Sequence, residues 1–166
     1  TDPVEDMESP WSSAQFQLVY DAARMNAEEL PRSYADFKTW ACEHPGRASY
    51  VAPGPGGFIG TRFVKGALFE ISGGAEQWST FDQALWDQWS PELWEYFNEL
   101  ESCLWRNGET YPKDEAELKS LFANKEVDFS MTNDITGAGA GIQNGLLPET
   151  ARAFVFDNYM IGDFNY

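Results

Sequence analysis

The sequence has few of the residues on which common catalytic and metal sites depend. Its 166 residues include one histidine, His44, and two cysteines, Cys42 and Cys103. The cysteines lie far apart, so they form neither a CxxC pair nor a metal-type spacing. His44 precedes Pro45-Gly46, where a helix end is expected, and the sequence contains no GxSxG nucleophile elbow. These absences argue against a Ser-His-Asp hydrolase and a zinc site, and we expect no catalytic residue, no metal and no cofactor.

Basic residues are also scarce. The chain has 11 Lys and Arg against 27 Asp and Glu, a formal net charge of −16. Because contacts to phosphates need a basic face, this balance argues against nucleic acid as a partner, and it disfavours an anionic membrane surface. Two interpretations of the acidity remain open: a solvated surface that keeps the protein soluble, or a field that attracts a cationic solute.

Long apolar runs are missing, yet there is enough apolar material for a core. No stretch is long and apolar enough to span a bilayer. A hydrophobic fraction of 43% and an aromatic fraction of 16% argue against disorder, and the length suits one domain. The two cysteines lie among apolar residues at helical spacing, which predicts buried free thiols. A disulfide stays open for an oxidising compartment.

Strand and helix patterns alternate along the chain. β-prone residues predict strands at 14–20, 48–52, 127–131, 151–157 and 159–166. Apolar periodicity and capping residues predict helices at 33–44, 61–71, 81–89, from Ser90-Pro91 to the break at Asn107-Gly108, and 115–124, with a weak helix inside 133–145. This order indicates an α/β fold: a three-layer sandwich with a central, mainly parallel mixed sheet.

The stretch 52–62, APGPGGFIGTR, is a glycine-rich connection from a strand to a helix. Such loops line the ligand crevice of an α/β sheet, and glycines let the backbone approach a ligand closely. The amides of Gly60, Thr61 and Arg62 are expected at a helix N-terminus, which favours an anionic or carbonyl group. The alternative is an ordinary tight turn, since the stretch matches neither GxGxxG nor GK[ST].

A second candidate is Thr132-Asn133-Asp134, directly after the strand that is expected to end at Met131. Short polar side chains at this point would face the same crevice. The alternative is that Asn133 or Asp134 caps the following helix.

The aromatic residues form the third candidate group, because aromatic walls stack on rings or cage cations. The alternative for each of them is a place in the core. The group comprises Trp11, Phe58, Tyr159, Phe164 and Tyr166.

Three long segments, residues 9–25, 30–71 and 121–166, resemble the periplasmic solute-binding proteins of ABC importers. The order of motifs carries the resemblance: PRSYADF, then HPGR and a strand, then the loop that opens a helix, and finally GLLPETARAFVFD. The resemblance is strongest to two-lobed, type II proteins related to iron, thiamine and polyamine binders, and it extends over nearly the whole chain.

The resemblance implies that this chain is one lobe, the second, of such a protein. Residues 1–13 would be a linker and incoming crossover, 14–158 a single α/β lobe, and 159–166 the outgoing crossover strand. Members of the family hold their ligand between the lobes with strand-to-helix loops. This implicates Trp11, Gly57, Phe58, Ile59, Gly60, Thr61, Arg62, Asn133 and Asp134 in ligand binding.

The function expected from the resemblance is solute capture, without catalysis, in the periplasm or another extracytoplasmic compartment. The partners would be a small-molecule solute, the first lobe of the same protein and an ABC permease in the membrane. Arg62 and the helix N-terminus favour an anionic solute, whereas Asp134 and the aromatic residues favour a cationic one. Two alternatives are a small transferase-like enzyme with Asp134 or Asp21 as base, and a protein-interaction module that uses exposed aromatic residues.

Overall fold

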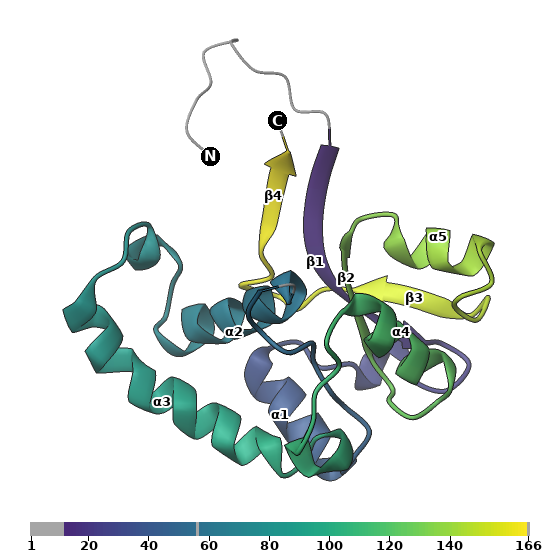
Figure 1. Cartoon of the computed structure of the whole chain (residues 1–166), viewed down its shortest axis with the longest axis horizontal. Coiled ribbons are helices and arrows are strands. Elements are labelled where there is room, and N and C mark those ends of the chain that lie inside the picture. The colour runs from purple at the N-terminus through teal and green to yellow at the C-terminus, as the bar shows by residue number, and fades with distance from the viewer. Residues whose placement is uncertain (1–11, 56, 166) are drawn as a thin grey trace.

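The long strand β1 (Ser12–Asp21) organises the sheet. The computed structural model describes residues 12–55 and 57–165. β2 (Ser130–Asp134) pairs with one edge of β1, from Ala14 to Val19. The other edge of β1 is shared: β4 (Gly162–Asn165) pairs with its first half and β3 (Ala151–Phe154) with its last four residues. In Figure 1, β1 and β4 stand side by side where the two chain ends emerge.

All three strand pairings are antiparallel, so the expected mainly parallel sheet is wrong. The α/β class is confirmed. The error has a specific origin, because β2, α5 (Gly137–Gln143) and β3 do form the strand–helix–strand unit that the sequence order suggests. The two strands of this unit run in the same direction but are not neighbours, since β1 lies between them and runs the opposite way.

Helices cover the sheet and extend to one side of it. Besides α5, they are α1 (Tyr34–Glu43), α2 (Phe58–Ile71), α3 (Gln83–Glu101) and α4 (Glu115–Ala123), with short 3-10 turns η1 (Ala27–Glu29), η2 (Glu76–Trp78) and η3 (Trp105–Gly108). Side-chain caps begin several of them, as the sequence suggests: Ser33 accepts the amide of Asp36, and Asp114 that of Glu117. No helix within residues 12–55 and 57–165 is long and apolar enough to cross a membrane.

Several expected elements differ. The strand expected at 127–131 is β2, which begins at Ser130 and continues to Asp134, so Thr132, Asn133 and Asp134 lie in the strand rather than after it. Residues 48–52 are extended but form no strand, because their backbone groups reach single, separate partners: Ala48 accepts from Trp105 and Ala52 donates to Pro112. The two helices expected around Ser90-Pro91 are one helix, α3, with Pro91 inside it. Proline removes one helical hydrogen bond, but the helix buries a continuous face on the far side of Pro91, at Leu93, Tyr96, Phe97 and Leu100, which offsets that loss.

The core contains a cluster of aromatic rings around Phe63 of α2, which is fully buried. Its ring contacts rings from β1, α1, α3 and the extended segment 48–52 at centroid distances of 4.9–6.4 Å. Aromatic pairs at such distances add to the free energy of burial. The core therefore fixes the N-terminal half of α2 relative to β1.

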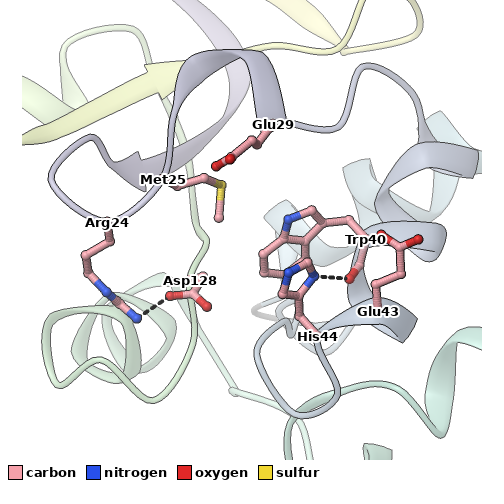
Figure 2. Close-up of a pocket in the computed structure, with 7 residues that line it drawn as sticks. All are labelled: Arg24, Met25, Glu29, Trp40, Glu43, His44 and Asp128. Carbon is pink, nitrogen blue, oxygen red and sulfur yellow. Dashed lines mark hydrogen bonds and ion pairs between the residues drawn. The ribbon is translucent and has the colours of Figure 1, made fainter.

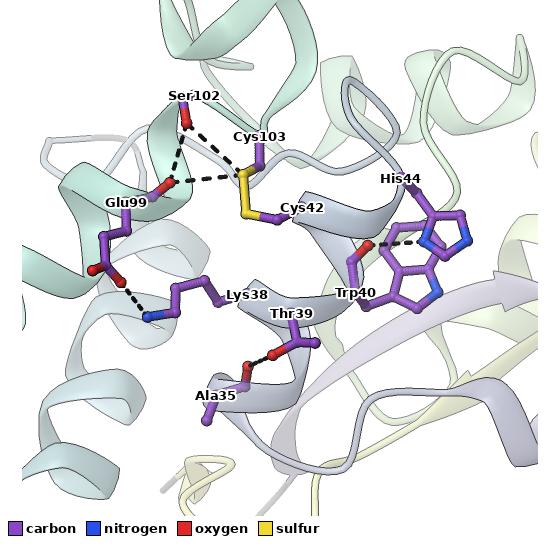
Figure 3. Close-up of a disulfide and its surroundings, with 9 residues drawn as sticks. All are labelled: Ala35, Lys38, Thr39, Trp40, Cys42, His44, Glu99, Ser102 and Cys103. Carbon is purple, nitrogen blue, oxygen red and sulfur yellow. Dashed lines mark hydrogen bonds and ion pairs between the residues drawn. A yellow bond between two sulfur atoms is a disulfide. The ribbon is translucent and has the colours of Figure 1, made fainter.

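The two cysteines form a disulfide between the last turn of α1 and the end of α3, so the expectation of free thiols is wrong (Figure 3). Cys42 is also exposed rather than buried. The bond joins residues 61 apart in sequence, and the amide of Gly46 donates to the carbonyl of Cys103 beside it. Disulfides persist in oxidising compartments.

The two segments expected to be crossovers lie side by side, because β1 and β4 pair from Ser12↔Asn165 to Gln15↔Gly162. Their function as crossovers, with the division at residues 1–13, 14–158 and 159–166, stays a prediction.

Candidate functional site

The glycine-rich loop leads into α2 three residues earlier than expected. Gly57 is the N-cap and Phe58 the first helical residue. The free amides of the first turn are therefore those of Phe58, Ile59 and Gly60. The amide of Thr61 donates to the carbonyl of Gly57 and is not available to a ligand. The expected anion site at residues 60–62 thus moves toward the start of the helix.

Two glycines allow this helix start to lie against the segment 48–52. A Cβ atom on Gly57 would overlap the carbonyl oxygen of Ala52, and one on Gly60 would overlap that of Val51. Both obstacles are backbone atoms, which cannot rotate away. The glycine content of the loop therefore serves close packing of two backbone segments.

A pocket of about 340 Å³ opens at this point. It is lined by the start of α2, the start of α4 and the end of β2: Val51, Phe58, Ile59, Asp114, Glu115, Ala116 and Asn133. The structure thus brings the first and second candidate groups of the sequence together, through Phe58, Ile59 and Asn133. The volume of the pocket lies in the range of small-molecule sites, roughly 300–1,000 Å³.

Asn133 carries the most informative atom of the pocket. Its side-chain oxygen Oδ1 is buried and has no hydrogen-bond partner among residues 12–55 and 57–165. The neighbouring Asp134 turns away: it is exposed, and its Oδ1 accepts from the amide and the hydroxyl of Thr136. Of the two residues, Asn133 is the one that lines the pocket, and its buried acceptor is unused among the described residues.

Thr61 and Arg62 hold the loop and the helix in place. The hydroxyl of Thr61 donates to the carbonyl of Gly57 and accepts from the amide of Gly54. Arg62 is buried, stacks over the ring of Phe58 at 4.5 Å, and donates from Nη1 to the carbonyl of Ile161 at 3.0 Å. The structure therefore ties α2 to the segment before β4 through Arg62.

The aromatic candidates are dispersed. Phe58 is 58% exposed at the pocket, and Tyr159 is half-buried beside Tyr34, whose hydroxyl donates to the Tyr159 carbonyl. Trp11 and Tyr166 lie outside the described residues, as does the side chain of Phe164. Elsewhere, Phe81 and Trp94 line an apolar groove of about 360 Å³ between α2 and α3.

Asp21, one of the two bases considered for an enzyme, is held in its ionised form. Burial raises the pKa of its carboxyl, but hydrogen bonds from Thr150 and the Ala23 amide, with the charge of Arg24, outweigh burial and lower the pKa below its ordinary value. A carboxylate with a lowered pKa is a weaker base than usual. Near the pocket, burial raises the pKa of Tyr50, so its phenol stays protonated.

The start of α4 is the part of the pocket that sequence reasoning missed. Asp114 is engaged as the N-cap of its own helix, and Glu115 pairs with Lys119 at 3.4 Å. The helix expected at 115–124 is confirmed as α4. The sequence around Asp114 does not show that the start of α4 lies beside the start of α2, because this position depends on the path of residues 102–113.

Known proteins resemble this chain in sequence and in structure. No family model matches the chain. The protein YnjB of Escherichia coli (strain K12) is 29% identical over 165 residues, which are 99% of this chain and 42% of YnjB. The crystal structure of iron-bound HitA from Pseudomonas aeruginosa matches with a TM-score of 0.59 and 14% identity, covering 93% of this chain and 42% of HitA. The chain resembles one lobe of a solute-binding protein.

The match to HitA concerns the fold of this chain, and the chain spans less than half of either protein. HitA is iron-bound in its crystal structure. Among residues 12–55 and 57–165 of this chain, no group of three or more His, Cys, Asp or Glu could hold a metal ion.

Proposed function

We propose that the chain is the second lobe of a two-lobed, type II solute-binding protein, and that the 340 Å³ pocket forms one wall of the cleft that holds a small solute. The observation that carries the proposal is the buried, unpartnered Oδ1 of Asn133. Leaving such an atom without a donor costs about 1–3 kcal/mol. An N–H or O–H group of a solute would satisfy it, while Phe58 and Ile59 contact the apolar part of the solute.

The complete protein would deliver its solute to an ABC permease from the periplasm or a comparable extracytoplasmic space. The disulfide between Cys42 and Cys103 supports an oxidising compartment. The pairing of β1 with β4 supports a hinge, because both chain ends leave this lobe through adjacent strands. Closure about such strands is a common mode of solute capture. We also propose that the lobe is the three-layer sandwich expected from the sequence.

The test uses the full-length protein that contains this chain. Mass spectrometry of solute that co-purifies with it identifies the ligand, and calorimetry then measures its affinity. Asn133→Ala is expected to weaken binding about tenfold, which corresponds to about 1.4 kcal/mol. Asn98→Ala, at an exposed position of α3, removes the same group elsewhere and serves as the matched control. Unchanged affinity in Asn133→Ala, or turnover of a substrate by the protein, would overturn the proposal.

A further inference from the structure

A second pocket, of about 490 Å³, lies at the opposite end of β2 from the candidate site. Asp128, two residues before the first residue of β2, lines it, whereas Asn133 lines the candidate site. The two residues are five positions apart in the chain, which is at most roughly 16 Å. The two pockets share no lining residue. The second pocket is therefore a separate feature and does not depend on the proposed function.

The walls of this pocket are chemically distinct (Figure 2). Met25 and Glu29 come from the loop after β1 and from η1, and Trp40 and His44 come from the end of α1. The rings of Trp40 and His44 stack at 4.3 Å with an angle of 17°. A thioether and an aromatic pair thus offer apolar contact, while carboxylates from Glu29, Glu43 and Asp128 lie around the same space.

The carboxylates around the pocket differ in whether arginine side chains neutralise them. Asp128 is paired with two guanidinium groups, Arg24 at 2.5 Å and Arg47 at 2.7 Å. Glu29 accepts only from the amide and side chain of Asn26, which are neutral, and it has no ion pair within the part of the chain that the structure describes. A negative charge at Glu29 therefore remains for a ligand.

His44 adds a hydrogen-bond acceptor. Its Nδ1 lies 2.8 Å from the carbonyl oxygen of Trp40, which can only accept, so Nδ1 carries the proton in the neutral ring. Nε2 then keeps its lone pair. The described residues contain no group that could hold a metal ion, so the cation that fits is not a bare metal.

We propose that this pocket binds a small organic ammonium ion, whose charge lies beside Glu29 and whose apolar body contacts Met25 and Trp40. A volume of about 490 Å³ accommodates a ligand of this size. The net charge of −16 attracts such a cation at a distance, and Glu29 and His44 provide the specific contacts.

Two probes of similar shape and opposite charge test the proposal on the full-length protein: phenethylammonium and 3-phenylpropanoate. Calorimetry is expected to show saturable binding of the ammonium ion with a millimolar or lower Kd, and none of the carboxylate. Resonances of the His44 imidazole, identified by their loss in His44→Gln, should shift with the same saturation curve. Equal binding of both probes, or no saturation up to about 10 mM, would overturn the proposal.

A pair of neighbouring substitutions locates the charge. Glu29→Gln removes the charge but keeps an oxygen that can accept from the Asn26 amide, so η1 should stay folded. Glu28→Gln removes an identical charge one residue away, at an exposed position that does not line the pocket. Glu29→Gln should weaken ammonium binding about tenfold, and Glu28→Gln less than about twofold. Equal losses would mean a general field effect and would contradict a specific site.

Binding in Asn133→Ala separates this proposal from the solute site. Phenethylammonium should bind that variant as it binds the unmodified protein, because Asn133 does not line the second pocket. Loss of phenethylammonium binding in Asn133→Ala would place the probe in the solute cleft and overturn the proposal.

Discussion

The two ends of β2 are held in place by different interactions. At its start, Asp128 binds Arg24 and Arg47, and the disulfide holds the neighbouring end of α1. Beside its end, α2 packs against residues 51 and 52 through backbone contacts that only glycine permits, and among the described residues the buried oxygen of Asn133 has no hydrogen-bond partner. The first end is stabilised by charge pairs and a covalent bond. The surroundings of the second end depend on close packing of backbone segments.

The disulfide gives the largest expected difference between the two ends. Replacing both Cys42 and Cys103 by Ala should lower the free energy of unfolding by about 4 kcal/mol, because the bond closes a long loop in the unfolded chain. The bonded residues are 61 apart in sequence. Denaturant unfolding measures the loss. Hydrogen exchange should show that protection falls more at residues 40–47 than at 57–63.

Ser102→Ala is the control for the disulfide, since it changes an exposed neighbour of Cys103 and leaves the bond intact. An equal fall of protection at both ends of β2 in the double variant would contradict the comparison.

Gly60→Ala should act on the other end. The added methyl group meets the carbonyl of Val51, so α2 must move away from the segment 48–52. Overpacking of this kind costs about 1–3 kcal/mol. The same change should weaken solute binding, because Val51, Ile59 and Asn133 line one pocket.

Gly139→Ala is a matched control for this substitution. Gly139 also lies inside a helix, but a Cβ atom there has no neighbour within 4 Å. It should stabilise the protein by about 0.5–1 kcal/mol, because alanine favours the helix over glycine. Thermal unfolding distinguishes the two. A stabilising effect of Gly60→Ala would show that the helix start is not closely packed.

Local chemistry accounts for the features that the sequence predicts correctly. Ser33 and Asp114 cap helices within three residues, and the β-prone run of β1 is visible without any long-range information. Phe58, Ile59 and Asn133, from the first two candidate groups, do line one pocket, although residues 48–52 form no strand and Asn133 lies within β2. Their expected function in binding stays a prediction.

The remaining features depend on residues far apart in the chain. Whether Cys42 meets Cys103 depends on how α1 packs beside the end of α3, which no local spacing encodes. The sheet differs from expectation for the same reason, since β1 lies between β2 and β3. Asp128 meets Arg24 only after β1 and β2 pair, so the charged end of β2 could not be found from the sequence.

Lowering the pH should have the smallest effect on stability. It should first weaken the structure around Asp128, at the start of β2. The folded pKa of Asp21 is lowered from its ordinary value of 3.8, because hydrogen bonds and Arg24 together outweigh the opposing effect of burial. A lowered pKa contributes stability that is present above the ordinary pKa and is lost as pH falls through the folded pKa. Asp21→Asn should therefore be less stable than the unmodified protein at pH 7. The difference should shrink as the pH falls below about 3.8.

Urea unfolding at several pH values measures this difference. Asp87→Asn, at an exposed position of α3, is the control for replacing a carboxylate by an amide. A constant difference for Asp21→Asn at all pH values would mean that its ionisation is not coupled to folding. Because Arg24 contributes to the lowered pKa of Asp21 and pairs with Asp128, protonation of Asp21 should also alter the Arg24–Asp128 pair.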